Sequence, residues 1–143
     1  MKQGFVKVAA ATPNVRVADV DYNKQEICKA IDEAVSNGAK LVVLPELCVT
    51  GYTCGDLFAQ DVLLKKAEEA LQEIITHTEG HDALMIVGLP YAVHGKLYNV
   101  AAVFSHGELL GLVPKTFLPN SGEAYEMRQF CPAPKKAEWL LIN

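Results

Sequence analysis

Two ionisable side chains follow apolar segments in a way that could serve a reaction. Glu46 comes after the apolar run 41–44 and a proline, and Lys115 comes after the apolar segment 108–113 and another proline. A carboxylate at a strand end is well sited to accept a proton, and an ammonium group can stabilise negative charge that develops on a substrate oxygen. The two residues therefore offer a base and a cation, and they indicate part of an active site.

The cysteines are the other candidates for chemistry. They are Cys28, Cys48, Cys54 and Cys131, without a C-x-x-C pair or a Cys/His cluster suited to zinc. Cys28 falls on the apolar face of a helical pattern and is most simply a small core residue. Cys48 and Cys54 are close to Glu46 in the sequence, so one of them could be a thiol nucleophile, although a nucleophile also needs an independently placed base. Cys131 precedes a proline in an irregular segment.

The first segments of the chain alternate between strand and helix patterns. Alternating apolar residues predict a strand over 5–10, ended by Thr12-Pro13. Apolar residues at helical spacing predict a helix over 21–37, closed by Asn37-Gly38. The continuous apolar run 41–44 is typical of a strand that is covered on both faces. Glu46 is thus expected directly after a buried strand.

A second helix and a third strand follow. Asp61 is expected to cap a helix whose apolar stripe ends near Gly80. The apolar segment 84–89 predicts the next strand, which we expect Pro90 to end. This order again places a helix between two strands, as in a layered α/β fold.

The next two predicted strands have no helix between them. Segments 97–104 and 108–113 predict a hairpin, in which Gly107 can take the positive φ of the turn. Crossovers and hairpins together indicate an α/β layered fold with a mixed sheet. Residues 119–143 have mostly loop chemistry, with one further short strand expected over 139–142. Because that last strand coincides with the end of the chain, we expect a fragment of a longer domain.

Composition and charge exclude several classes of protein. The 143 residues are 50% hydrophobic and carry a formal net charge of −4, so the chain can bury a core and has no basic footprint for nucleic acid. No apolar run approaches the length of a membrane span, and the start of the sequence is unlike a signal peptide. We expect a cytoplasmic protein that binds neither nucleic acid nor membrane.

Several segments resemble the nitrilase, or carbon–nitrogen hydrolase, superfamily. They occur in the expected order and are LPELCVTGY at 44–52, VGLP at 87–90, GKLYN at 95–99 and PKTFLPN at 114–120. Two more segments, TCGDLF at 53–58 and YEMRQF at 125–130, resemble the amino-terminal glutaminase domain of glutamine-dependent NAD synthetases. The resemblance covers most of the chain.

The resemblance implies a fold and a set of roles. The superfamily has an αββα sandwich that commonly forms dimers, and it hydrolyses amides or nitriles through a Glu-Lys-Cys triad. By resemblance, Glu46 is the general base and Lys115 stabilises the oxyanion. Glu123 matches a second family glutamate that orients the lysine or the substrate. Tyr52 either lines the substrate pocket or is a buried aromatic residue with a bonded hydroxyl.

The family's nucleophilic cysteine has no counterpart in this sequence. The family motif would lie several tens of residues beyond Lys115, so we expect residues 1–143 to be the first part of a glutaminase domain that is inactive alone. The implied substrate is a small amide, glutamine, and a homo-oligomer is expected. No cofactor or metal is expected in this chain, since ATP and magnesium would belong to an absent synthetase domain.

Two other hypotheses remain open at this point. One is a free-standing amidase or carbamoylase of the same superfamily, truncated at the same place. The other is a non-catalytic module that oligomerises through a sheet face and edge left uncovered.

The histidines are assigned to structure rather than to catalysis. His77 and His81 flank the end of the second predicted helix, where the helix dipole favours an imidazolium. His94 and His106 stand beside glycines in expected turns and should be exposed. None of the four is needed for a Glu-Lys-Cys scheme.

Overall fold

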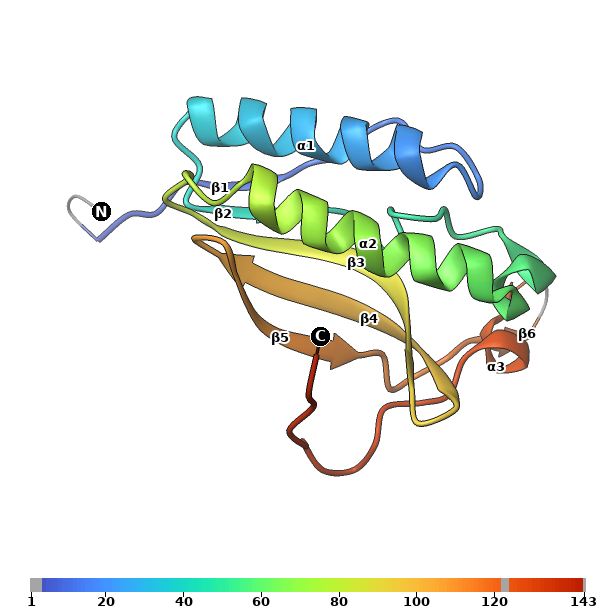
Figure 1. Ribbon diagram of the computed structural model, residues 1–143. Helices are drawn as coiled ribbons and strands as arrows, with labels where there is room; N and C mark the ends of the chain where they lie inside the picture. Colours follow the sequence, from blue (N-terminus) through green and yellow to red (C-terminus); the bar gives the residue numbers. More distant parts are fainter. Residues whose placement is uncertain (1–3, 122–123, 143) are drawn as a thin grey trace.

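A computed structural model describes residues 4–121 and 124–142, which form a mixed sheet covered by helices on one face (Figure 1). The sheet has the order β1-β2-β3-β4-β5, in which β1, β2 and β3 are parallel and β3, β4 and β5 are antiparallel. The strands are β1 (Val8–Ala10), β2 (Leu41–Val43), β3 (Leu84–Val93), β4 (Lys96–Ser105) and β5 (Glu108–Pro114). The expected α/β fold with a mixed sheet is confirmed.

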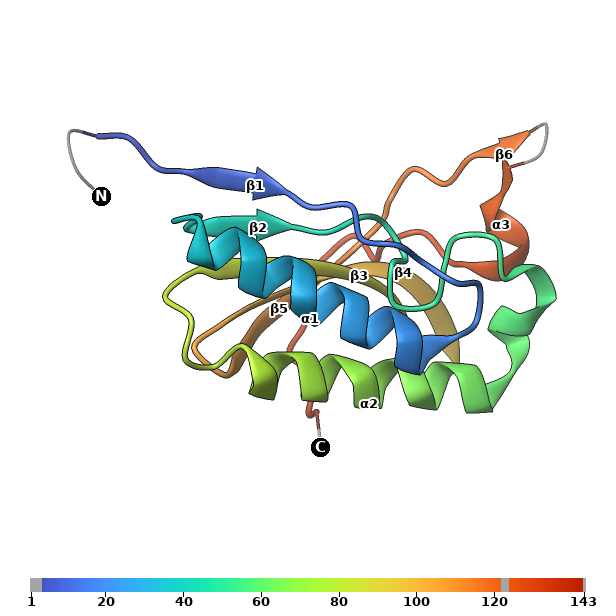
Figure 2. The same ribbon diagram turned by 90° about the horizontal axis from the view of Figure 1, so that it is seen from above.

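Two long helices, α1 (Val20–Ser36) and α2 (Asp61–His77), cross the same face of the sheet side by side (Figures 1 and 2). Each presents an apolar stripe to the strands, as the periodicity predicts. Ile27 of α1 and Ile74 of α2 are fully buried, and so is Phe104 of β4 beneath them. The core therefore lies between the helical layer and the sheet.

The helix ends differ slightly from the prediction. Asp19 caps α1 by accepting a hydrogen bond from the backbone N–H of Tyr22 at 3.2 Å. Asp61, expected as the cap of α2, is instead its first residue, and Gln60 before it makes no capping bond with its side chain. An acidic residue in the first turn still stabilises the helix through its dipole.

β3 is longer than the sequence predicts, because it continues through Pro90 to Val93. β2 pairs with β3 only as far as Ile86, so the far half of β3 has one strand neighbour, and a proline is tolerated where one strand edge is free. The extension creates a hairpin with β4 that was not predicted. Its turn, His94-Gly95, has positive φ angles of 50° and 75°.

The second hairpin turns at His106-Gly107, again with positive φ at both residues, as expected from Gly107. The strand expected over 139–142 is wrong. These residues are irregular, and the Trp139 side chain is fully exposed. A short apolar segment forms a strand only where a neighbouring strand can pair with it.

Short elements complete the structure beyond the sheet. A 3₁₀ segment, η1 (Gly55–Ala59), precedes α2, and α3 (Glu126–Gln129) follows the small pair β6 (Asn120–Ser121) and β7 (Ala124–Tyr125). η1 and α3 lie side by side at one end of the molecule (Figure 1). The ring of Phe58 in η1 packs against that of Phe130, the residue directly after α3, with ring centroids 4.9 Å apart.

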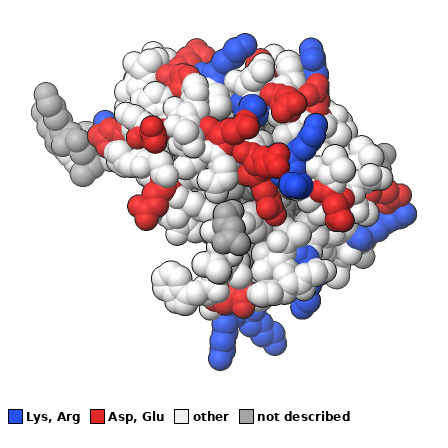
Figure 3. Space-filling view, viewed as in Figure 1, with Lys and Arg blue, Asp and Glu red and all other residues white. Residues whose placement is uncertain are grey.

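The surface of the helical layer mixes both signs of charge, with Lys and Arg interspersed among Asp and Glu (Figure 3). Such a surface is typical of a solvent-facing layer. Among the described residues, no helix combines the length and the apolar character needed to cross a bilayer.

Candidate active site

Glu46 lies in a tight turn immediately after β2. The backbone N–H of Val49 donates to the Gly88 carbonyl at 3.2 Å, and that of Gly51 donates to the Leu47 carbonyl at 2.7 Å. Leu47 itself has a positive φ of 52°, which few non-glycine residues adopt. The turn is therefore fixed against β3, and it holds the Glu46 side chain at the end of the sheet.

Lys115 follows β5 and reaches the same place. Its backbone N–H donates to the Asn99 carbonyl at 2.8 Å, which continues the pairing of β4 and β5 by one residue. Its Nζ atom donates to Glu46 Oε1 at 2.6 Å and to Glu126 Oε1 at 2.9 Å. One ammonium group thus bridges two carboxylates that come from distant parts of the chain.

Two neutral side chains complete this arrangement, one on each carboxylate. Asn99 Nδ2 donates to Glu46 Oε1 at 2.7 Å, and the Tyr52 hydroxyl donates to Glu126 Oε1 at 2.8 Å. We call these five residues, Glu46, Tyr52, Asn99, Lys115 and Glu126, the lysine cluster. Since both carboxylates are held through Oε1, each keeps its Oε2 atom free of hydrogen bonds from the described residues.

The cluster is electrostatically coupled. Burial of Lys115 acts against its charged form, but hydrogen bonds from Nζ to Glu46 and Glu126 outweigh this effect and raise the pKa of the lysine. The hydrogen bond to Glu126, with partial burial, raises the pKa of Tyr52. Lys115 therefore stays a cation, and Tyr52 stays a hydrogen-bond donor, at neutral pH.

The structure brings Glu46, Lys115 and Tyr52 together, whereas the sequence pattern had linked only Glu46 and Lys115. The predicted Glu123 lies outside the described residues. Glu126, which the sequence reasoning missed, contacts Lys115 instead and is 5% exposed. Its position within the segment 125–130 was the available signal, but Glu126 comes only three positions after Glu123, and the sequence alone does not distinguish the two.

Asn99 was also missed, although it ends the segment 95–99 that carried part of the family resemblance. The hydroxyl of Tyr52 is bonded, but 42% of the residue is exposed, so it is not the buried aromatic residue of the second reading, and its role in substrate binding stays a prediction. Its ring contributes to a pocket beside the cluster.

The cysteines that could have served as nucleophiles lie in apolar surroundings. Cys48 Sγ is buried against the Gly88 carbonyl at 3.7 Å, and burial raises the pKa of this thiol to about 12. Cys54 Sγ lies 3.2 Å from the Thr50 carbonyl, and burial raises its pKa as well. Burial raises the pKa of Cys28 to about 11. These thiols are not activated, because activation requires a lowered pKa.

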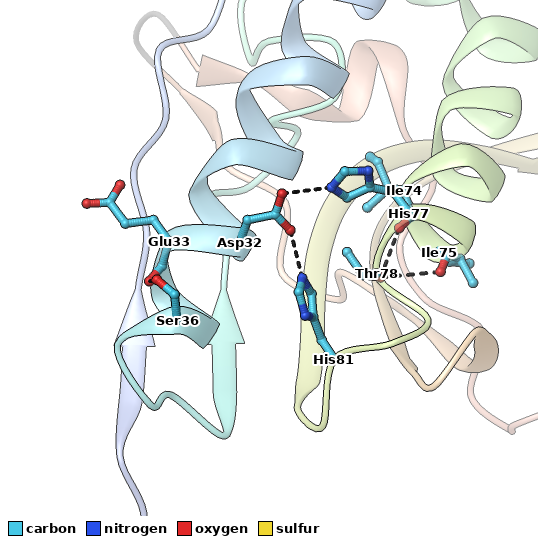
Figure 4. A network of polar contacts seen from close by, with 8 residues as sticks. All are labelled: Asp32, Glu33, Ser36, Ile74, Ile75, His77, Thr78 and His81. Atoms are coloured by element: carbon cyan, nitrogen blue, oxygen red, sulfur yellow. Dashed lines mark hydrogen bonds and ion pairs between the residues drawn. The ribbon is translucent and has the colours of Figure 1, made fainter.

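A second polar network lies away from the lysine cluster, between the helices (Figure 4). Asp32 of α1 contacts His77 Nε2 at 2.8 Å and His81 Nε2 at 2.7 Å; His77 is the last residue of α2, and His81 lies in the loop that follows it. The histidines thus have the structural role that was expected, through a carboxylate rather than through the helix dipole alone. Within 4–121 and 124–142, no group of His, Cys, Asp or Glu side chains is arranged to hold a metal ion.

Comparison of the sequence with known protein families identifies a family and several relatives. The family model described as carbon-nitrogen hydrolase matches residues 7–136. The glutamine-dependent NAD(+) synthetase of Aquifex aeolicus is 42% identical over 126 residues, which are 88% of this chain and 22% of the relative. That of Mycobacterium tuberculosis (strain CDC 1551 / Oshkosh) is 37% identical over 131 residues, 92% of this chain and 19% of the relative. The chain spans about a fifth of the length of these relatives.

Solved structures show the same likeness. A glutamine-dependent NAD(+) synthetase from Cytophaga hutchinsonii superposes with a TM-score of 0.89 at 33% identity, over 96% of this chain and 23% of that one. An amidase from Nesterenkonia sp. superposes with a TM-score of 0.77 at 22% identity, over 97% of this chain and 53% of that one. The second likeness concerns the fold alone.

Proposed function

Because the chain belongs to the carbon–nitrogen hydrolase family, we propose that it forms part of a glutaminase domain that supplies ammonia for glutamine-dependent NAD(+) synthesis. The observation that carries the proposal is the bridge from Lys115 Nζ to Glu46 and Glu126. The NAD(+) synthetases of Aquifex aeolicus and Mycobacterium tuberculosis support it as relatives over most of the chain.

Glu46 is the proton acceptor in this proposal. Its Oε1 atom is anchored by Lys115 and Asn99, so the free Oε2 atom is the one available to take a proton. The carboxyl group would accept the proton of an attacking thiol and pass it to the departing amide nitrogen, which leaves as ammonia. In the second half-reaction it would accept a proton from water, which hydrolyses the thioester to release the carboxylic acid and the thiol.

Lys115 is the electrophilic partner. When the thiol attacks the amide carbon, the carbonyl oxygen gains negative charge, and a fixed ammonium group stabilises that charge most where water is excluded. Glu126 acts as a positioning residue because it accepts a hydrogen bond from Nζ, and Tyr52 acts through Glu126, to which its hydroxyl donates. Two carboxylates around one ammonium also keep the lysine charged.

The thiol itself would come from outside this sequence. Burial raises the pKa values of Cys28, Cys48 and Cys54, which is unfavourable for a nucleophile. We therefore expect these 143 residues, taken alone, to release no ammonia from glutamine.

The test is to express the complete reading frame that contains this segment, whatever its length, and to measure ammonia release from L-glutamine. We expect Glu46→Gln and Lys115→Met each to lower kcat at least about 10²-fold. Lys66 is an exposed residue of α2, so Lys66→Gln is the control for the loss of one positive charge. Activity that survives both substitutions in the lysine cluster would contradict the proposal.

A second candidate function, a module that associates with another copy, is favoured by the sheet face opposite the helices. One cross-strand row on this face consists only of apolar residues and glycine, and it comprises Ala10, Val43, Ile86, Val103 and Gly111. The helices cover only the other face (Figure 1). An uncovered apolar face of this kind associates readily.

Light scattering of the 143-residue chain distinguishes this candidate. We expect dimers or larger species that Val43→Glu dissociates, since Val43 is 38% exposed on that face. Val62→Glu, at an exposed position of α2 on the opposite side of the molecule, is the matched control. A monomer at high concentration would remove the support for an association module.

A further inference from the structure

Asn99 lies inside the sheet, and its side chain is directed at the lysine cluster. Its backbone is paired on both sides, since Pro90 of β3 is its cross-strand partner and the N–H of Lys115 donates to its carbonyl at 2.8 Å. The residue is only 4% exposed. A side chain carried by a strand that is held on both sides has a well-defined position, so the Asn99 amide can orient whatever it binds.

The hydrogen bond of Asn99 differs from those of other buried, neutral polar side chains. Asn23, Thr50 and Thr78 are fully buried, and their side chains bond to backbone groups of nearby turns and helix ends. Asn99 Nδ2 instead donates at 2.7 Å to Oε1 of Glu46, which is 53 positions away in the sequence. Burial of an amide costs free energy unless it is hydrogen-bonded. The partner that stabilises this buried amide is thus an active-site carboxylate.

Lys115 is shared between two carboxylates. Its Nζ atom carries three hydrogens and donates to Glu46 at 2.6 Å and to Glu126 at 2.9 Å. In the proposed reaction the third hydrogen faces the amide oxygen, and the negative charge that grows on this oxygen competes with both carboxylates for the ammonium group. The contact of Lys115 with Glu46 is therefore weakest when Glu46 has to transfer a proton.

Glu46 needs a second donor because its side chain is long and 42% exposed. Such a side chain has several accessible rotamers, and ordering it costs conformational entropy. A single hydrogen bond to one oxygen also leaves the carboxylate free to turn about that contact. Asn99 and Lys115 donate to the same oxygen from β4 and from the residue after β5. Because Oε1 is held from two directions, the direction of Oε2 is fixed as well.

We infer that Asn99 is a positioning residue, which holds Oε1 of Glu46 while Lys115 turns to the substrate oxygen and so keeps Oε2 directed at the proton to be transferred. The inference rests on the proposed glutaminase function. Asn99 acts through Glu46 and does not touch the substrate itself. A neutral amide suits this task, because it holds the carboxylate without the charge of a second cation.

Steady-state kinetics of the complete reading frame with L-glutamine test the inference. Asn99→Leu removes the donor and roughly keeps the volume of the side chain, and Asn99→Asp keeps its shape but replaces the donor by an acceptor. We expect each substitution to lower kcat about 10²-fold and to change KM less than about twofold, because a misplaced base slows the chemical step without removing a substrate contact. Thr78→Val removes the hydrogen bonds of a buried hydroxyl at the end of α2 and is the matched control, which should leave kcat unchanged.

NMR spectra of the side-chain amides of the 143-residue chain test the contact without turnover. The Asn99 signals, identified by their loss in Asn99→Leu, should move in Glu46→Gln, because a neutral amide then replaces the carboxylate that accepts the hydrogen bond. The signals of Asn23, which is also buried, should stay in place. Circular dichroism checks that each variant is folded.

If hydrolysis depends on Glu46 but both Asn99 variants keep kcat within about threefold of the parent, the inference is overturned and the proposed function stands. A change in KM alone, or an equal loss of kcat in Thr78→Val, would also overturn it, since these indicate a substrate contact or a general loss of stability. If the parent releases no ammonia, the proposed function fails instead. Movement of the Asn99 signals in Glu46→Gln would then still support the part of Asn99 in orienting Glu46, and unmoved signals would contradict it.

Discussion

Gly88 lies so close to Leu47 that no side chain fits between them. A Cβ atom at Gly88 would lie 2.5 Å from the backbone nitrogen of Leu47 and 2.7 Å from the Pro45 carbonyl oxygen. These are backbone atoms of the turn that carries Glu46, so they cannot move aside as a flexible side chain could. The close packing of β3 against this turn is what holds the Glu46 carboxylate at Lys115.

Gly88→Ala should therefore destabilise the protein and displace Glu46. We expect a loss of about 3 kcal/mol in the free energy of unfolding, at the upper end of the range for overpacking, because the clash is with backbone. Urea denaturation measures it. Gly111→Ala in β5 is the control, since a Cβ atom there meets nothing within 4 Å, and it should cost less than about 0.5 kcal/mol. Equal effects of the two substitutions would contradict the packing argument.

Lys115→Met should leave the buried Glu126 carboxylate without its cation. Removal of one partner from a buried ion pair costs about 3–5 kcal/mol, and the partial exposure of Lys115 lowers our expectation to about 2 kcal/mol. Adding Glu126→Gln should recover part of the loss, because the uncompensated charge is then removed. Lys24→Met, which breaks the exposed pair with Glu73, should cost less than about 1 kcal/mol in the same urea experiment.

Asp32→Asn should weaken the packing of α1 on α2. Burial of Asp32 acts to raise its pKa, but hydrogen bonds from His81 and His77 outweigh it and lower the pKa below the ordinary 3.8. A lowered pKa in the folded state means that the contribution is fully present above pH 3.8 and is lost as pH falls through the folded value.

Because the Asp32 side chain is 44% exposed and solvent screens its charge, the difference in unfolding free energy between the parent and Asp32→Asn should be no more than about 0.5 kcal/mol near pH 5 and should shrink below pH 3.8. Thermal unfolding at a series of pH values measures it. Glu33→Gln, on the neighbouring position of α1, should show no such trend. If the difference in unfolding free energy between the parent and Asp32→Asn instead grew toward low pH, the inference that the folded protein lowers the pKa of Asp32 would be contradicted.

Cys48 should resist alkylation in the folded protein. Burial raises the pKa of Cys48 to about 12, so almost none of the thiol is ionised at pH 8, and the sulfur is also buried. Mass spectrometry after iodoacetamide treatment should find the half-exposed Cys131 labelled before Cys48, and should find all four cysteines labelled in urea. Rapid labelling of native Cys48 would revive it as a candidate nucleophile.

The sequence by itself determined most of the helices and strands and identified Glu46 and Lys115 as candidate active-site residues. Helical and strand periodicity identified α1, α2 and the hairpin of β4 and β5, because burial on one face imposes a repeat on the local sequence. The apolar runs before Glu46 and Lys115 indicated that both residues follow strands. Pro90 misled the prediction, since its tolerance depends on whether β3 has a second neighbour at that point, and local sequence does not show that.

Tertiary structure alone decided which side chains meet. Glu46 and Lys115 are 69 positions apart, and their contact depends on the register of the sheet and on the turn packed against Gly88. The same holds for Glu126, which reaches Lys115 because α3 packs on η1, whereas the family resemblance had pointed to Glu123. Which residues form hydrogen bonds over such separations depends on how the elements pack, and the local periodicity of the sequence does not reveal that packing.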